Sequence, residues 1–193
     1  MNKNIMIVGV GGQGSLLASR ILGYAALEKG YDVKVSEVHG MSQRGGSVVT
    51  YVKYGDKIHS PIIDKGEADA ILSFELLEAA RWLPYLRKGG TIITAEQRIK
   101  PMPVITGAKV YPDQIIEKIR AKNVTLISAD TLSIARQGGN EKASNVALIG
   151  LATQALGFDA ENIRQAIIAC VPAKALKANL AAFEIAYNSA AAL

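Results

Sequence analysis

The chain has 193 residues and 49% hydrophobic side chains, which is enough for one domain over residues 1–193 with a buried core. No apolar run is long enough to cross a bilayer, and the first apolar stretch leads into a glycine loop without a cleavage site. We therefore expect a cytoplasmic protein with no membrane contact. The net charge of +5 comes from dispersed lysines and arginines, which excludes a typical nucleic-acid-binding stripe.

The N-terminal third predicts a β-loop-α-β unit followed by a third strand. Residues 5–10 form a continuous apolar run, which is typical of a central strand buried on both faces. Apolar residues then recur at helical spacing over 16–29, and residues 33–38 alternate as a second strand. Residues 47–54 indicate another strand, and after the Gly-Asp turn we expect residues 57–60 to return as its hairpin partner. The crossover of the first unit should be right-handed.

The rest of the chain continues the alternation of strands and helices and then becomes helical. Buried strands are predicted at 70–74, 91–95 and 124–128, with helices from Glu75 to before Pro84 and at 112–122 between them. Three further helices are predicted at 145–156, 159–169 and 172–187. This order predicts an α/β fold: a doubly wound, Rossmann-like, mostly parallel sheet with a helical C-terminal segment packed against it.

A glycine loop follows the first strand and suits two interpretations. Gly11, Gly12, Gln13 and Gly14 allow a sharp turn at a helix N-terminus, whose free N–H groups suit a phosphate. Glu37, near the end of the second strand, stands where a dinucleotide-binding domain places its ribose-binding acid. In the alternative interpretation the glycines only permit tight strand–helix packing, and Gln13 has a partner other than phosphate.

The loop after the second strand is the other candidate site. Its sequence is HGMSQRGG, and its glycines imply positive φ or close backbone contacts. Arg44 can hold a carboxylate or phosphate by two parallel hydrogen bonds, so we expect Gln13 and Arg44 to converge on one anionic group. A solvated turn in which Arg44 pairs with Glu37 remains the alternative. The candidate ligand-binding or interface residues of this loop are His39, Ser42, Gln43, Arg44 and Gly45, and no catalytic or metal-binding residue is assigned.

Two motifs together resemble a known family. The start IMIVGVGGQG and the segment SEVHGMSQRGGSVVTYVKYG look like the gamma-type domain of 2-oxoacid:ferredoxin oxidoreductases. The later stretches SPIIDKGEADAILSFELLEAARWLPYLRKGG and NVALIG also fit, so the resemblance covers nearly the whole chain. The form HGMSQRGG on a short chain is most similar to the beta subunits of the indolepyruvate type. Assignment to indolepyruvate instead of pyruvate, 2-oxoglutarate or a branched-chain oxoacid depends on overall likeness.

The resemblance implies a division of labour between subunits. A larger partner would carry thiamine diphosphate, magnesium and iron–sulfur clusters, and the complex would convert an aryl 2-oxoacid to its acyl-coenzyme A while reducing ferredoxin. This chain would carry no cofactor and would be inactive alone. Its single cysteine, Cys170, agrees with this, because a cluster needs about four cysteine ligands.

Two questions of partnership stay open in the sequence. An independent dinucleotide-binding module is the other class of function, with His39 as its only candidate proton-transfer residue. The segment 145–156 is apolar nearly all round, so it is either buried or at an interface. In the subunit interpretation we expect part of the C-terminal helical segment, or the hairpin around Tyr51 and Tyr54, to contact the partner. A dimer of this chain is also compatible with the resemblance.

Overall fold

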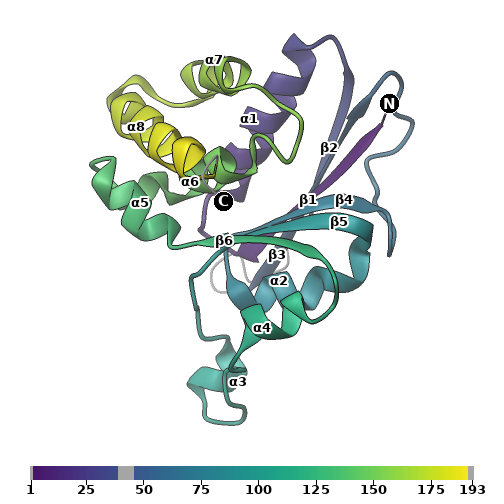
Figure 1. The fold of residues 1–193 in the computed structure, drawn as a ribbon, viewed down its shortest axis with the longest axis vertical. Coiled ribbons are helices and arrows are strands. Elements are labelled where there is room, and N and C mark those ends of the chain that lie inside the picture. Colours follow the sequence, from purple (N-terminus) through teal and green to yellow (C-terminus); the bar gives the residue numbers. More distant parts are fainter. Residues whose placement is uncertain (1, 39–45, 191–193) are drawn as a thin grey trace.

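A six-stranded sheet lies at the centre of the computed structural model, which describes residues 2–38 and 46–190 (Figure 1). Its spatial order is β2 (Asp32–Val38), β3 (Ser47–Gly55), β1 (Lys3–Val10), β4 (Ala68–Ser73), β5 (Leu86–Ala95) and β6 (Thr125–Ala129). Parallel pairing joins β1 to β4, β4 to β5 and β5 to β6. The predicted mostly parallel sheet is therefore confirmed.

β3 is the antiparallel exception, and its pairing corrects one prediction. It lies between β1 and β2 and pairs with both, so that Tyr54 stands opposite Lys3 and Val33. The predicted hairpin with residues 57–60 is wrong, since those residues form no strand. The physical reason is burial. Residues 48–52 are buried on both faces, so β3 takes a central position, whereas most of 57–60 is exposed.

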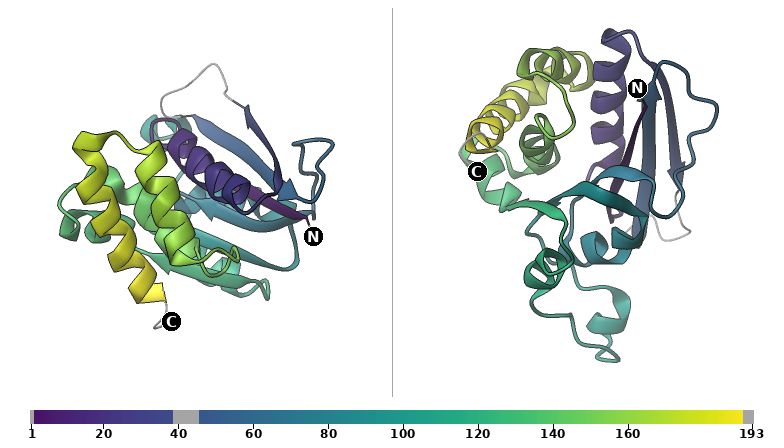
Figure 2. Two further views of the ribbon diagram at one scale, coloured as in Figure 1. Left: turned by 90° about the horizontal axis from the view of Figure 1, so that it is seen from above. Right: turned by 45° about the vertical axis from the view of Figure 1, so that its right-hand side comes forward.

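Helices cover both faces of the sheet, as predicted for a doubly wound fold (Figure 2). On one face, residues packed into the core come from α1 (Ser15–Glu28), α5 (Thr131–Gln137), the 3-10 helix η2 (Glu141–Ala143), α6 (Ser144–Ala152), α7 (Ala160–Cys170) and α8 (Ala173–Ala190). On the other face they come from α2 (Leu76–Trp82) and α4 (Ile115–Arg120), with the 3-10 helix η1 (Leu83–Tyr85) alongside. The short α3 (Met102–Ile105) projects away from the sheet. None of the described helices has the length and apolar content that a bilayer span requires.

The core explains why β1 is apolar at every position from residue 5 to residue 10. Ile5 and Ile7 pack on the side of α1, whereas Met6 and Val8 pack on the side of α2. Alternate side chains of a strand point to opposite faces, so β1 needs apolar residues at successive positions. α1 leaves β1 toward one face, and α2 leaves the neighbouring β4 toward the other. The carboxyl ends of β1 and β4 therefore form a topological switch point, where open α/β sheets usually bind ligands.

Two segments that the sequence made candidates for a subunit contact are buried inside the chain, which for 145–156 was the other expected alternative. α6 is buried along nearly its whole length and packs against α8, where a Cβ on Gly150 would lie 2.7 Å from the Phe183 carbonyl oxygen. Tyr51 and Tyr54 are also buried, and the Tyr54 hydroxyl donates to the Leu156 carbonyl at 3.1 Å. The apolar character of α6 and of the two tyrosines is thus explained by the chain's own core.

Candidate functional site

The glycine loop lies at the switch point and has the backbone geometry that its glycines permit. Gly12 and Gly14 have φ of +100° and +86°, and Gly14 is the N-cap of α1. A Cβ on Gly14 would stand 2.5 Å from the side-chain nitrogen of Asn145 in α6. That amide donates to the Gly14 carbonyl at 3.3 Å. The glycines therefore serve both a left-handed turn and close packing between α1 and α6.

The Gln13 side chain is held by hydrogen bonds within the chain. Its Oε1 accepts from the Val10 N–H at 2.7 Å, and its Nε2 donates to the Phe74 carbonyl at 2.9 Å and to the Gln97 Oε1 at 3.1 Å. The amide thus links the ends of β1, β4 and β5. This geometry favours the interpretation in which Gln13 has a partner other than phosphate.

The two loops of the candidate site meet at one described contact. The Gly11 N–H donates to the Gly46 carbonyl at 3.0 Å, which places the end of the second loop against the glycine loop. His39, Ser42, Gln43, Arg44 and Gly45 lie outside the described residues, so the expected convergence of Arg44 with Gln13 stays a prediction.

Glu37 lies in β2 and faces α1, where its Oε1 accepts from the Ser19 hydroxyl at 3.3 Å. The insertion of β3 separates β2 from β1 by one additional strand. Neighbouring strands are about 4.8 Å apart, so Glu37 stands roughly 5 Å further from the glycine loop than an acid on an adjacent strand would. This arrangement weakens the interpretation of Glu37 as a ribose-binding acid.

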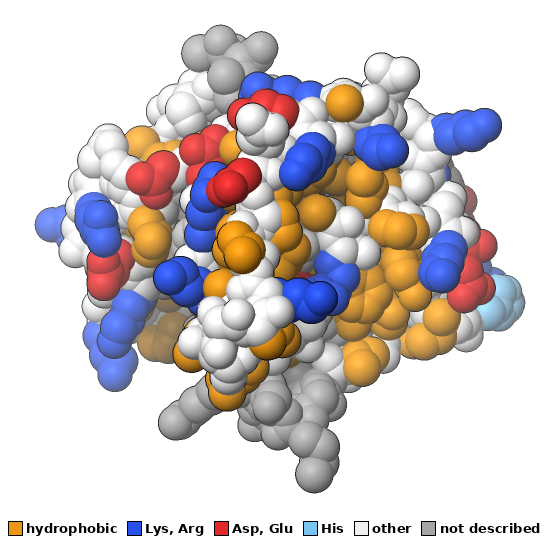
Figure 3. All heavy atoms as spheres, turned by 90° about the horizontal axis from the view of Figure 1, so that it is seen from below, with side chains coloured by type: hydrophobic (Ala, Val, Ile, Leu, Met, Phe, Trp, Pro, Cys, Tyr) orange, Lys and Arg blue, Asp and Glu red, His pale blue; other side chains and the backbone are white. Residues whose placement is uncertain are grey.

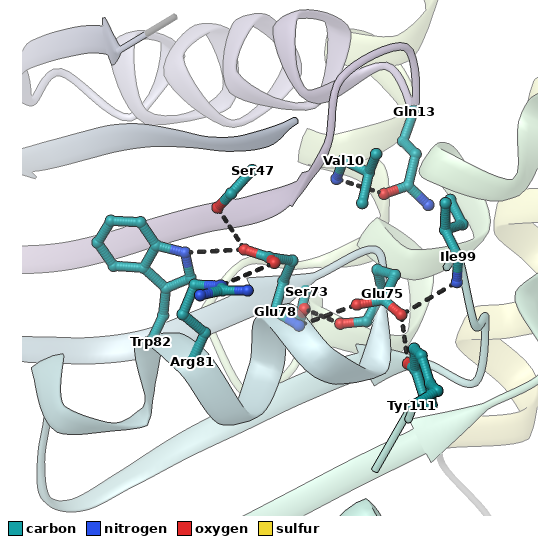
Figure 4. A network of polar contacts seen from close by, with 10 residues as sticks. All are labelled: Val10, Gln13, Ser47, Ser73, Glu75, Glu78, Arg81, Trp82, Ile99 and Tyr111. Carbon is teal, nitrogen blue, oxygen red and sulfur yellow. Dashed lines mark hydrogen bonds and ion pairs between the residues drawn. The ribbon is translucent and has the colours of Figure 1, made fainter. Parts of the chain in front are cut away.

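Two buried carboxylates that the sequence analysis did not select organise the same edge (Figure 4). Glu75 is 1% exposed and Glu78 is 4% exposed. Glu75 is the N-cap of α2 and accepts from the Glu78 N–H at 2.9 Å through Oε2. Its Oε1 accepts from the Ile99 N–H at 3.1 Å and from the Tyr111 hydroxyl. An acid at a helix start with a second acid three residues later resembles a capping box, and that signal was present in the sequence.

Glu78 connects α2 to the start of β3. One of its oxygens accepts from the Ser47 hydroxyl and, at 3.2 Å, from the indole nitrogen of Trp82. The other accepts from Nε of Arg81 at 2.9 Å. Since Ser47 directly follows the loop that ends at Gly46, Glu78 fixes the position at which that loop returns to the sheet.

Burial and hydrogen bonding determine the state of Tyr111. Loss of solvent raises the pKa of its phenol, and the hydrogen bond to Glu75 raises it further. The hydroxyl therefore stays protonated at neutral pH and acts as a donor to the carboxylate.

A cavity of about 300 Å³ lies between this edge and α3. Its polar wall contains Glu75 and Glu78, whose oxygens are engaged as described, and Arg81 and Lys100 also line it. A second cavity of about 400 Å³ adjoins Gly12, Gln13 and Lys142.

The described edge has the character of a scaffold that positions loops. Among the described residues, no group of three or more His, Cys, Asp or Glu side chains is arranged to hold a metal ion. Cys170 lies at the end of α7, and burial raises the pKa of its thiol, which lowers its thiolate fraction. The hydrogen bonds of the described side chains fix the ends of β1, β3, β4 and β5 relative to one another.

Comparisons with known proteins identify relatives along the whole chain. The indolepyruvate oxidoreductase subunit IorB of Pyrococcus horikoshii is 44% identical over 192 residues, which cover 97% of this chain and 95% of that protein. The protein of the same name from Methanothermobacter thermautotrophicus is 35% identical and is matched over 99% of both chains. The pyruvate/ketoisovalerate oxidoreductases common subunit gamma of Thermococcus kodakarensis is 26% identical over 93% of this chain and 92% of its own.

Solved structures show the same fold. The gamma subunit of a keto/oxoacid ferredoxin oxidoreductase from Geobacter sulfurreducens superposes with a TM-score of 0.72 at 22% identity, over 99% of both chains. The 2-oxoglutarate:ferredoxin oxidoreductase of Magnetococcus marinus gives 0.74 at 16% identity and covers all of this chain but 31% of that one. A family model described as pyruvate ferredoxin/flavodoxin oxidoreductase matches residues 4–189. The resemblance read from the glycine motifs is thus confirmed, and the chain belongs to the pyruvate ferredoxin/flavodoxin oxidoreductase family.

Proposed function

We propose that the chain, as a single domain over residues 1–193, is the small subunit of a cytoplasmic indolepyruvate:ferredoxin oxidoreductase. The complex oxidatively decarboxylates an aryl 2-oxoacid to its acyl-coenzyme A and passes the electrons to ferredoxin. The observation that carries this proposal is the 44% identity to the Pyrococcus horikoshii subunit over almost the full length of both proteins. Relatives named for other oxoacids match less closely, for example the common gamma subunit at 26%.

The cofactors of this reaction belong to a larger partner subunit in our proposal. An iron–sulfur cluster needs about four cysteine thiolates, and this sequence has Cys170 alone. The donor set of this chain therefore does not fit a cluster. Thiamine diphosphate requires a divalent cation, and the described residues offer no cluster of ligands for one. We accordingly assign no catalytic step to this chain and expect the isolated chain to be inactive.

The loop from Glu37 to Gly46 contributes binding groups to the assembled enzyme in this proposal. Its end lies against the glycine loop through the Gly11–Gly46 hydrogen bond, at the switch point of the sheet. Arg44 supplies a two-pronged contact to a phosphate, a substrate carboxylate or an acidic side chain of the partner. An independent dinucleotide-binding module is less well supported, because the Gln13 amide is engaged inside the chain and β3 displaces Glu37.

Reconstitution tests the proposal. The chain is purified alone and together with its co-expressed large subunit, and iron content and oxoacid-dependent reduction of ferredoxin are measured for both. We expect to find iron and turnover only in the complex and not in the isolated chain. Indolepyruvate should be preferred over pyruvate, 2-oxoglutarate and branched-chain oxoacids. Turnover by the isolated chain would contradict the subunit assignment. A preference for another oxoacid would contradict only the choice of substrate.

A further inference from the structure

A segment between β5 and α4 extends away from the body of the molecule and carries exposed apolar side chains. We call residues 98–111, which include α3, the α3 arm (Figure 1). Met102 is 65% exposed, Ile105 63% and Val110 86%. The space-filling view from below shows hydrophobic side chains gathered on this side of the molecule (Figure 3). Clustered exposed apolar side chains on an ordered segment are typical of an interaction site.

The α3 arm is held in place at its base. Glu75 Oε1 accepts from the Ile99 N–H in the first leg and from the Tyr111 hydroxyl in the second. The two legs are therefore joined through one buried carboxylate, and the Lys109 N–H donates to the Pro103 carbonyl at 2.9 Å further out. Burial of a carboxylate costs free energy unless the carboxylate is hydrogen-bonded. The hydrogen bonds from both ends of the arm offset this cost, and they hold the arm in one position relative to α2.

The charge of the α3 arm indicates what it would bind. Residues 98–111 contain Arg98, Lys100 and Lys109 and no acidic residue. Arg98 lies 3.9 Å from Asp113, outside the arm, whereas the other two side chains have no ion pair with a described residue. An apolar tip flanked by these two lysines is complementary to an apolar groove with carboxylates at its rim.

We propose that the α3 arm is the element by which this chain docks onto the large subunit, in an apolar groove rimmed by Asp and Glu side chains. This inference rests on the proposed function, because it presupposes a large partner. The Magnetococcus marinus enzyme contains this fold within a chain of which it covers 31%, so there the domain is joined to further parts of one polypeptide. The cavity of about 300 Å³ beneath the arm continues the contact toward Gly46 and the switch point.

The test compares substitutions on the arm with matched substitutions elsewhere. The first variant combines Met102→Ser with Ile105→Ser, and the second combines Lys100→Glu with Lys109→Glu. The control combines Leu27→Ser with Ile168→Ser, which are 58% and 47% exposed on α1 and α7, over the other face of the sheet. Affinity for the purified large subunit is measured at two salt concentrations, and the melting temperature of each variant is measured alone.

We expect both arm variants to keep the melting temperature of the original chain and to raise Kd at least about tenfold. The Met102/Ile105 variant loses buried apolar contacts, and the lysine variant places glutamates against the carboxylates at the rim of the groove. The control should bind as the original chain does. The salt dependence of binding should be reversed in the lysine variant, because its glutamates repel the rim carboxylates and salt screens that repulsion, whereas in the original chain salt screens an attraction.

Each other result has a distinct meaning. If the unmodified chain does not bind the large subunit, the proposed function fails. If it binds and both arm variants bind equally well, or if the control variant weakens binding as much as they do, the docking assignment is overturned. If the Met102/Ile105 variant alone fails to fold, the lysine variant still decides the question.

Discussion

At the scale of single residues, Gln13 shows how a side chain that suits a ligand serves the fold instead. Its amide satisfies the Val10 N–H and the Phe74 carbonyl at the junction of two strands. We expect Gln13→Ala to lower the free energy of unfolding by about 1–3 kcal/mol, because partly buried backbone groups lose their partners. Urea unfolding measures this change. Gln97→Ala is the control and should cost less, since it removes one of the three contacts.

The opposite pattern of results would restore a binding role for Gln13. That role would require unchanged stability of the Gln13→Ala chain together with lost turnover of the assembled enzyme. The sequence alone could not separate these alternatives, because the Gln13 partners Phe74 and Gln97 lie 61 and 84 residues away. The same limit applies to Glu75, whose helix-capping pattern is local but whose contact with Tyr111 is not.

Two tyrosines, the buried Tyr54 and the partly buried Tyr111, predict how stability depends on alkaline pH. Burial raises the pKa of Tyr54 and of Tyr111 above the ordinary value of 10.0. Near pH 10 the unfolded chain therefore releases protons that the folded chain retains. Stability should be constant with respect to these groups below that pH and should fall as pH rises above it.

Unfolding in urea at several values between about pH 8 and pH 11 measures this loss. Tyr111→Phe should be less stable at neutral pH, because Glu75 loses a donor, but should show a shallower alkaline decline. An equal decline in the two proteins would mean that Tyr111 ionises freely in the folded state.

At the scale of secondary structure, the sequence predicted which segments form strands but not how all of them pair. Hydrophobic periodicity located β1, β2, β4, β5 and β6, because burial of alternate or successive residues is a local property. The pairing of β3 with β1 and β2 depends on competition between distant segments, and a turn signal after β3 wrongly suggested a hairpin. The short α3 was missed because four residues carry no helical period.

Close packing of α6 on α8 predicts that Gly150 in α6 does not tolerate a side chain. A Cβ on Gly150 would stand 2.7 Å from the Phe183 carbonyl oxygen and 2.8 Å from the Ala186 Cβ. We expect Gly150→Ala to destabilise the chain by about 1–3 kcal/mol, because overpacking outweighs the better helix propensity of alanine. Gly23→Ala in α1 is the matched control. Its Cβ would meet Val33 and Val35 at 3.7 Å, so it should be neutral or stabilising by up to about 1 kcal/mol.

Urea unfolding of the two alanine variants measures this difference in stability. The two values can be compared directly, since both substitutions add the same methyl group. Equal stability of the two proteins would show that α8 can move away from α6 at little cost.

At the scale of the whole molecule, the sequence predicted the doubly wound architecture and the helical C-terminal segment, because alternating strands and helices allow few arrangements. It did not predict which surface remains apolar. Segment 145–156 is apolar nearly all round, which suited burial and a partner contact equally, and α8 and the sheet cover it. The arm that does expose apolar side chains contains two prolines and mixed residues, and such a pattern gives no sign of exposure.

Association with a large subunit should stabilise this chain as a whole. A partner that binds only the folded chain adds about 2.7 kcal/mol when its free concentration is about 100 times Kd. We expect amides in the central strand β1 to exchange with solvent mainly through global unfolding, because this strand is paired on both sides and buried on both faces. Their hydrogen exchange should therefore slow by about a hundredfold at that partner concentration.

Mass spectrometry of peptides that contain residues 5–8 measures the slowing of hydrogen exchange in β1, although the proposed contact with the partner lies in the α3 arm. The Met102→Ser, Ile105→Ser variant provides the control at the same concentration of partner. A Kd raised about tenfold would reduce the slowing to about tenfold, because the effect follows the ratio of partner concentration to Kd. If exchange slows in the arm peptides while β1 is unchanged, the partner binds the folded and the unfolded chain equally well, and the stability of this subunit is independent of assembly.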